Sequence, residues 1–254
     1  MIKIENTEVL GWEAAIRGMR NPMNSWEKSD SGYGCYCFND KAYYCKSCSI
    51  VGPTRDECND LCEYILGPND YELAYKLTKA GTDHRKFMRM ITVYIDITAP
   101  LYWWKEFDTY KVGTVANSCS TMHKIHEKEF TWDDFSFENI PEKFDWFLNE
   151  GNFLYDLLFA LNDARENYIK TKDKKYWWQM IQLLPSSYNQ KRTVMLNYEV
   201  LANIYKSRKN HKLDEWVDFC KWIETLPYSE LITGQSQLQD DEEDQEAEEL
   251  KRDE

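Results

Sequence analysis

The sequence predicts an α+β fold that is rich in helices, with a small sheet and an inserted cysteine-rich segment. Most of the 254 residues fall in segments whose apolar side chains recur at three- and four-residue spacing, which is typical of helices that bury one face. Residues 88–98 instead alternate and are rich in β-branched side chains, which indicates a strand. Residues 33–66 hold six of the eight cysteines and interrupt this pattern.

Turn and cap residues give the order of the elements. Asn69 is expected to cap a helix that Gly81 ends, and Ala99-Pro100 is expected to convert the strand into the next helix. The segment 6–20 is predicted to be an amphipathic helix with Trp12 on its apolar face. The helices are predicted over residues 6–20, 70–80, 101–110, 143–170, 177–185, 190–207 and 213–225.

The charge is uneven along the chain. The formal net charge is −13, and the segment from Asp240 to Glu254 carries ten acidic and two basic residues. Residues 239–254 are therefore predicted to be a disordered acidic tail that favours solubility, the alternative being an acidic arm that mimics nucleic acid. This balance argues against a protein that binds duplex nucleic acid, since neutralising phosphates needs clustered Lys and Arg.

Neither a membrane span nor a secretion signal is visible. No apolar run approaches the ~18 residues that a membrane helix needs, and the N-terminal segment lacks a basic region followed by a long apolar stretch. A cytoplasmic location is expected. In that compartment closely spaced cysteines favour zinc over disulfides.

The cysteine-rich segment has spacings suited to a metal. Two cysteines separated by two residues can present thiolates from a tight turn, and two separated by three residues share a helical face. The expected zinc ligands are Cys45, Cys48, Cys58 and Cys62. Cys35 and Cys37 compete for the same places, so reduced, unliganded cysteines remain the alternative. Elsewhere, Cys119 and Cys220 are expected to be buried.

Small polar side chains gather in the segment 111–123. Gly113 loosens the backbone there, and such a segment can surround a phosphate with donors. The expected nucleotide and phosphate ligands are Lys111, Thr114, Asn117, Ser118, Ser120, Thr121 and His123. Farther on, helical spacing places Asn197 and Arg208 on one face, and a partly buried Arg needs an anion or a planar polar partner. Arg208 could instead form a structural ion pair with Glu199 or Asp214.

The order of these motifs resembles the flavin-dependent thymidylate synthase family, the flavin enzymes that methylate dUMP. Ala99-Pro100 matches the family's helix opening, and Asn117 and Ser120 match its Asn-Glu-x-Ser-x-Arg-Tyr motif. The later matches are Leu184-Pro185, Asn197, Leu201, Asn203, Arg208, His211 and Trp216. The resemblance covers roughly residues 80 to 220. It implies this family's fold for residues 1–238, with the segment 33–66 as an insertion.

The resemblance also implies ligands and an assembly. It assigns Arg208 the role of polarising a pyrimidine, and it assigns Asn197, Asn203 and His84 to a site for FAD. It implies a homotetramer with sites shared among subunits. A small nucleotide is the expected ligand.

Several family residues are replaced. The Arg-His-Arg triplet aligns with Thr109, Tyr110 and Lys111, so one cation of three remains. The other replacements are Ser118 for Glu, Met122 for Arg, His123 for Tyr, Glu199 for Arg and Glu106 for Gln. Losing these cations weakens phosphate sites. The departures favour a repurposed nucleotide-binding protein without standard dUMP methylation, the alternative being an active, divergent flavin enzyme of the dUMP methyltransferase type.

Overall fold

The computed structural model describes residues 2–34, 63–141 and 153–234. The chain divides into two compact units. Unit 1 consists of Met1–Glu8, Tyr94–Met195 and Asn210–Phe219, and unit 2 consists of Val9–Val93, Leu196–Lys209 and Cys220–Glu254. In these described ranges, no helix is both long enough and apolar enough to cross a membrane.

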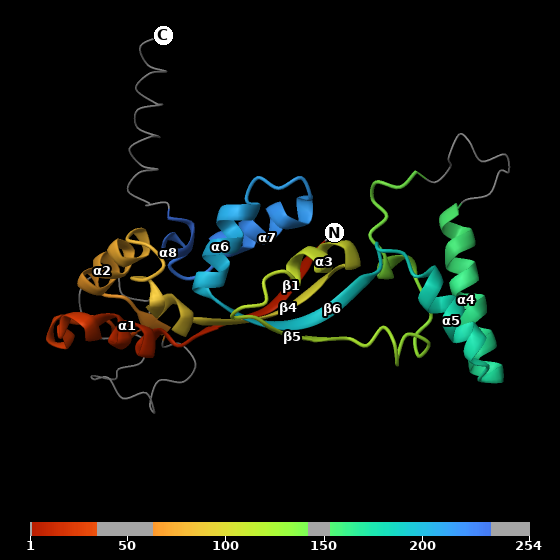
Figure 1. Ribbon diagram of the computed structural model, residues 1–254, viewed down its shortest axis with the longest axis horizontal. Helices are drawn as coiled ribbons and strands as arrows, with labels where there is room; N and C mark the ends of the chain where they lie inside the picture. Colours follow the sequence, from red (N-terminus) through yellow and green to blue (C-terminus); the bar gives the residue numbers. More distant parts are fainter. Residues whose placement is uncertain (1, 35–62, 142–152, 235–254) are drawn as a thin grey trace, which may run out of the picture. The chain divides into compact units, whose positions relative to one another are not determined.

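Most of a four-stranded sheet belongs to unit 1. Its strands lie in the order β1-β4-β6-β5, and β5 runs antiparallel to β6 (Figure 1). The strands are β1 (Lys3–Leu10), β4 (Thr92–Pro100), β5 (Val115–Ser118) and β6 (Asn189–Asn197). The pairing of β5 with β6 runs from Val115 opposite Met195 to Ser118 opposite Arg192. The small predicted sheet is thus present, with more strands than the single one expected.

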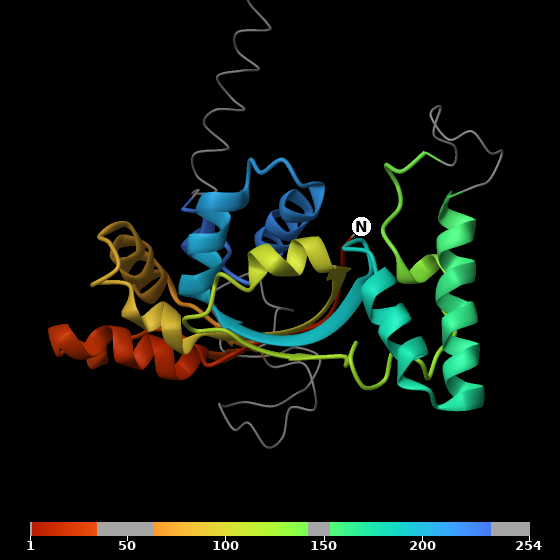
Figure 2. The same ribbon diagram turned by 45° about the vertical axis from the view of Figure 1, so that its right-hand side comes forward.

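One face of this sheet is buried by aromatic side chains. Along β4, Ile95, Ile97 and Ala99 are at most 1% exposed, as strand alternation requires. The helix α3 (Leu101–Phe107) begins directly after Pro100 and lies over the sheet (Figures 1 and 2). Its buried rings contact those of α7 (Asp214–Glu224): the cluster consists of Trp103, Trp104, Phe107, Trp216 and Phe219.

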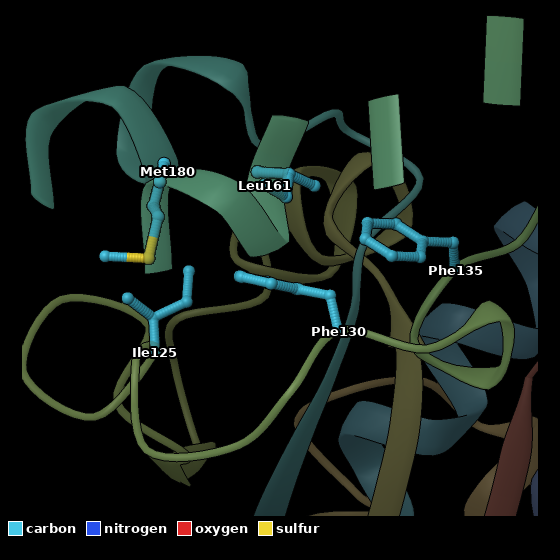
Figure 3. Close-up of a cluster of buried hydrophobic side chains, with 6 residues drawn as sticks. Ile125, Phe130, Phe135, Leu161 and Met180 are labelled. Atoms are coloured by element: carbon cyan, nitrogen blue, oxygen red, sulfur yellow. The ribbon is translucent and has the colours of Figure 1, made fainter. Parts of the chain in front are cut away.

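A second core in unit 1 joins two helices to a long connection. The helices α4 (Phe153–Thr171) and α5 (Lys174–Leu183) pack against each other. The connection before them includes the 3-10 helix η4 (Trp132–Asp134). Side chains from all three meet in one apolar cluster (Figure 3), which consists of Ile125, Phe130, Phe135, Leu161, Ala164 and Met180.

Unit 2 is mainly helical. Its helices are α1 (Trp12–Arg20), α2 (Pro68–Lys79), α6 (Tyr198–Arg208), α8 (Glu230–Thr233) and the 3-10 helices η1 (Asn21–Met23), η2 (Trp26–Lys28) and η3 (Lys86–Met90). Two short strands, β2 (Gly32–Gly34) and β3 (Glu63–Ile65), pair antiparallel. The unit also contains the last residues of β1 and β6, the first residues of β4 and the C-terminal part of α7.

A buried ion pair fastens α1 to α2. Arg20 Nε lies 2.6 Å from Asp70 Oδ1, and the side chains are 4% and 0% exposed. Asp70 also accepts hydrogen bonds from the hydroxyl groups of Ser29 and Ser31 and from the backbone N–H of Asp30. These donors replace the water that the carboxylate loses on burial.

Two predicted helices are partly strands. Residues 6–10 continue β1, and α1 begins only at Trp12, because Gly11 takes φ +94 and turns the chain between them. A Cβ at Gly11 would lie 2.2 Å from the Met90 carbonyl oxygen, so the close approach requires glycine. The helix predicted over 190–207 is wrong in its first half, because residues 189–197 form β6 and the helix α6 starts at Tyr198.

The predicted cap of α2 is also wrong. The helix begins at Pro68, and the residue that supplies the capping oxygens is Asp30, which accepts hydrogen bonds from the backbone N–H groups of Asn69 and Asp70. A distant side chain thus takes the role expected of Asn69. The prediction that the chain turns at Gly81 agrees with its φ of +107, one residue after the cap at Ala80.

Candidate functional site

The expected ligand segment 111–123 is a turn, a strand and a second turn. Gly113 has φ +79 and sits in the first turn, where Lys111 is exposed and the Thr114 hydroxyl donates to the Tyr110 carbonyl. Residues 115–118 then form the strand β5. The strand extends the backbone by about 3.3 Å per residue, so the donors of the two turns do not form one ring.

Strand alternation separates the polar side chains of β5. Asn117 lies opposite Thr193 and Ser118 lies opposite Arg192, so their side chains point to opposite faces of the sheet. Beyond the strand, Ser120 Oγ accepts a hydrogen bond of 2.9 Å from the backbone N–H of His123. This contact closes the second turn and leaves the hydroxyl proton of Ser120 able to donate.

Cys119 is exposed, so the prediction that it is buried is wrong. Its backbone N–H donates to the Lys191 carbonyl at 2.9 Å, and its carbonyl accepts from Gln190 Nε2 at 2.9 Å. The edge position of β5 keeps the thiol outside the core while both backbone groups are paired. Cys220 is buried as predicted, and burial raises the pKa of its thiol to about 11.

Arg192 is a basic residue beside this segment that the sequence did not single out. Its guanidinium lies 4.1 Å from the centre of the Trp104 ring, donates to Gln190 Oε1 at 2.9 Å and pairs with Asp108 Oδ1 at 2.7 Å. The alternating pattern of residues 189–197 would have placed Arg192 on the inner face of a strand. The expected helix over that segment hid this signal.

In the same unit, Glu106 is held by two side chains. Trp216 Nε1 donates to Glu106 Oε2 at 3.0 Å, and His211 Nε2 lies 3.5 Å from the same oxygen. The Nδ1 atom of His211 accepts a hydrogen bond from the backbone N–H of Leu213. The proton of a neutral His211 is therefore on Nε2, directed toward the carboxylate.

The remaining expected ligands lie in unit 2. Asn197 is 8% exposed, and its Oδ1 accepts a hydrogen bond of 3.0 Å from Val200 N, so it caps α6. His84 is exposed in the turn before η3. Asn203 accepts a hydrogen bond of 3.0 Å from the Arg85 guanidinium. Arg208 lies in the last turn of α6, and its positive charge lowers the pKa of the Cys220 thiol, against the larger effect of burial.

Two arginines surround Glu199. Arg89 donates two hydrogen bonds to its carboxylate, and Arg85 Nε lies 3.5 Å from Oε1. The hydrogen bond from Arg89 and the positive charges of both arginines hold the pKa of Glu199 below its ordinary value of 4.5. The carboxylate is ionised at neutral pH, so the three side chains carry a net charge of +1.

The expected ligands therefore form two groups, one in each compact unit. The segment 111–123 belongs to unit 1, where β6 pairs Ser118 with Arg192. The other group belongs to unit 2, where Arg85 joins Asn203 to Glu199. Its expected members are His84, Asn197, Asn203 and Arg208.

The predicted zinc ligands lie outside the described residues, as do Cys35, Cys37 and the acidic tail. Across residues 2–34, 63–141 and 153–234, no group of three or more His, Cys, Asp or Glu side chains is arranged to hold a metal. Zinc in the cysteine-rich segment stays a prediction.

No model of a known protein family matches the sequence, and a search of curated proteins finds no match. The fold nevertheless has counterparts among solved structures. A structure of thymidylate synthase X from Helicobacter pylori with FAD and dUMP aligns with a TM-score of 0.58 and 15% identity, over 92% of this chain and 97% of that one. A second structure, of the flavin-dependent thymidylate synthase from Helicobacter pylori with FAD and dUMP, aligns with a TM-score of 0.57 and 16% identity. The alignment covers 91% of this chain and 97% of that one.

A third counterpart is named for activity on UMP as well as dUMP. The UMP/dUMP methylase PolB from Streptomyces cacaoi, bound with 5-Br dUMP, aligns with a TM-score of 0.53 and 13% identity, over 92% of this chain and 95% of that one. The predicted helix-rich α+β fold class is confirmed, since the chain has the fold of flavin-dependent thymidylate synthases. The predicted cysteine-rich insertion lies largely outside the described residues. At these identities the likeness concerns the fold.

Proposed function

We propose that this chain binds a small nucleotide in a flavin-dependent thymidylate synthase fold and does not carry out standard dUMP methylation. Proteins of this fold are found with FAD, dUMP and a halogenated dUMP. In this chain, neutral or acidic side chains stand at several positions where the family has cations. A pocket with altered charge suits binding of a related ligand better than the family's reaction.

The arrangement around Glu199 is the observation that carries this proposal. Glu199 stands where the family has an arginine. By itself, the carboxylate of Glu199 would repel a phosphate. Arg89 reaches this carboxylate from η3, and Arg85 reaches it from the residue before η3. The local charge is therefore still positive. A guanidinium suits phosphate oxygens. Arg89 is 53% exposed and can turn toward an anion while Arg85 stays beside the carboxylate.

The other expected residues complete the proposal. Arg208 contacts the base or a second phosphate, and His84, Asn197 and Asn203 serve the cofactor side of the site. In unit 1, taken by itself, residues of the segment 111–123 are proposed to hold a phosphate: Lys111, Thr114, Asn117, Ser118, Ser120, Thr121 and His123. The homotetramer implied by the resemblance is part of this proposal, and a monomer mass of 30.4 kDa in light scattering would contradict it.

An active flavin enzyme is the second candidate. It is favoured by the FAD and dUMP present in two of the similar structures. The donors of Arg85 and Arg89 suit the phosphates of FAD as well as those of a nucleotide. An absorption spectrum of the purified protein separates the candidates, because bound oxidised flavin gives visible bands. Methylation of dUMP by the flavin-loaded protein would establish the second candidate.

Calorimetric titration tests the proposed binding. UMP, dUMP and FAD are titrated into the full chain and into the Arg89→Ala variant. We expect at least one of these ligands to bind, and the variant to lose roughly tenfold in affinity, the value of one charge-assisted hydrogen bond. Arg17→Ala is the matched control, since Arg17 is an exposed arginine of the same unit and lies 3.9 Å from Glu13. Equal affinities for all three proteins would place the ligand elsewhere.

A further inference from the structure

The helix α4 carries an aromatic face that the fold does not bury. Tyr155 and Phe159 are one helical turn apart and are 60% and 73% exposed. The ring of Trp132, itself 39% exposed, contacts the Tyr155 ring edge-on at 4.8 Å. The opposite face of α4 contributes Leu161 to the core of Figure 3. Exposed aromatic rings that adjoin each other are characteristic of binding surfaces.

Carboxylates adjoin these rings in a hollow of about 370 Å³. The hollow is lined by Tyr155 and Phe159 and by the acidic residues Glu129, Asp163 and Glu166, and none of its lining residues is basic. Lys170 lies 3.1 Å from Glu166, but both side chains are more than 60% exposed. A surface pair of this kind contributes little and exchanges readily for another cation.

The two sides of the hollow are fixed to each other. Asn162 accepts a hydrogen bond of 3.0 Å from the backbone N–H of Phe130 and donates one of 2.9 Å to its carbonyl. These two hydrogen bonds anchor the connection before η4 to the middle of α4. Phe130 is buried in the apolar core. The carboxylate of Glu129 is therefore presented next to the helix on a fixed backbone rather than on a free loop.

We propose that this surface is a docking site for a basic segment of another protein, with an arginine or lysine side chain entering the hollow. A cation placed there meets aromatic faces and carboxylates together, the two groups that bind guanidinium and ammonium best. The hollow fits one side chain, and the exposed rings beside it offer apolar contact for the neighbouring residues. In a symmetric contact with a second copy at this face the carboxylates would meet the same carboxylates, and the chain's own acidic tail carries the wrong sign.

A peptide titration tests the docking site. The probes are an acetylated, amidated peptide of alternating Arg and Leu and its Glu and Leu counterpart, each titrated into the full chain. We expect the basic peptide to bind and the acidic one to fail. Asp163→Asn with Glu166→Gln, and separately Phe159→Ala, should each weaken the basic peptide by roughly tenfold. Phe159 is largely exposed, so its replacement leaves the fold intact, which circular dichroism checks.

A control separates this site from general attraction to an acidic protein. Glu8→Gln with Glu27→Gln removes two exposed carboxylates outside α4 and should leave the affinity unchanged. The proposal is overturned if this control weakens the peptide as much as the α4 variants do, or if the parent does not bind the basic peptide. It is also overturned if Phe159→Glu converts an oligomer into a monomer in sedimentation while the parent binds no peptide, because the face is then a subunit interface.

Discussion

The polar residues of unit 2 and those of the segment 111–123 in unit 1 are used in different ways. In unit 2, Asn197 caps α6, Asp70 is buried against Arg20, and Glu199 is held by two arginines. In the segment 111–123 most side chains are exposed, and the contact made by Ser120 closes only a local turn. Polar residues in the first region stabilise the fold, whereas those in the second are not needed for it.

This difference changes how the family resemblance is to be read. A matched residue that already has a structural partner, such as Asn197, has a reason in the fold whether or not it also contacts a ligand. A polar residue that is exposed and contributes little to packing is available to contact a ligand, because the fold does not use it. Substitutions of the structural polar residues of unit 2 should therefore lower stability, whereas substitutions in the segment 111–123 should lower ligand affinity.

Breaking the buried ion pair of unit 2 gives the largest expected effect. Asp70→Ala leaves the buried charge of Arg20 without its carboxylate partner and removes the acceptor of the Ser29 and Ser31 hydroxyls. We expect a loss of about 3–5 kcal/mol in the free energy of unfolding. Denaturant titration followed by circular dichroism measures it. A loss below 1 kcal/mol would mean that the pair contributes no more than a surface contact.

The same carboxylate should make stability depend on pH. Burial alone would raise the pKa of Asp70, but hydrogen bonds from Ser31, Ser29 and Arg20 outweigh it and hold the pKa below its ordinary value of 3.8. A lowered pKa in the folded state stabilises the fold fully above 3.8, and this contribution is lost as the pH falls through the lowered value. Asp70→Asn should reduce this acid sensitivity.

The fold could be predicted from the sequence where one periodicity dominates. The alternation of 88–98 gave β4, and the spacing of apolar residues gave α4, α5 and α7. The segment 190–207 was misread because β6 passes into α6 without a turn residue between them, so an alternating pattern was taken as part of a helical one. Hydrogen bonds to the neighbouring strands determine that residues 190–197 are extended, and these bonds are not visible in the sequence.

The candidate site was less predictable for a related reason. Arg85, Arg89 and Arg192 act through partners distant in sequence: Arg89 lies 110 residues from Glu199, and Arg192 lies 84 residues from Asp108. Residue type and spacing along the chain cannot reveal such pairs. Arg208 is predicted from its helical spacing with Asn197 together with the family resemblance, and its role stays a prediction.

Removing Arg208 should affect ligand binding more than stability. Arg208→Ala deletes a charge-assisted contact of order 2–3 kcal/mol, which corresponds to roughly a 30-fold to 150-fold loss in nucleotide affinity. Calorimetric titration with UMP, dUMP and FAD measures the affinity, and thermal unfolding measures stability. If the variant binds its best ligand as well as the parent but unfolds more easily, Arg208 belongs with the structural polar residues of unit 2.

Asn197 allows the structural and ligand roles of one residue to be separated. Asn197→Ala removes the cap of α6 and should cost about 1 kcal/mol of stability. Asn197→Asp keeps a capping oxygen but lacks the amide donor, so it should retain nearly all of the stability. If Asn197→Asp also binds FAD or nucleotide like the parent, the amide has no ligand role. A weaker affinity with unchanged unfolding would show that Asn197 serves both.

The smallest effect on stability is expected in the segment 111–123. Lys111 is exposed in the first turn, so Lys111→Ala should change the free energy of unfolding by no more than about 0.5 kcal/mol. Its loss should nevertheless weaken nucleotide binding severalfold if the ammonium group contacts a phosphate. Lys105→Ala is the matched control, because Lys105 is an exposed lysine of the same unit on α3. Calorimetry on both variants at equal ionic strength separates a contact from general charge. If Lys111→Ala and Lys105→Ala weaken binding equally, Lys111 attracts the ligand only through its charge. The exposed side chain of Lys111 then has no specific contact with the ligand.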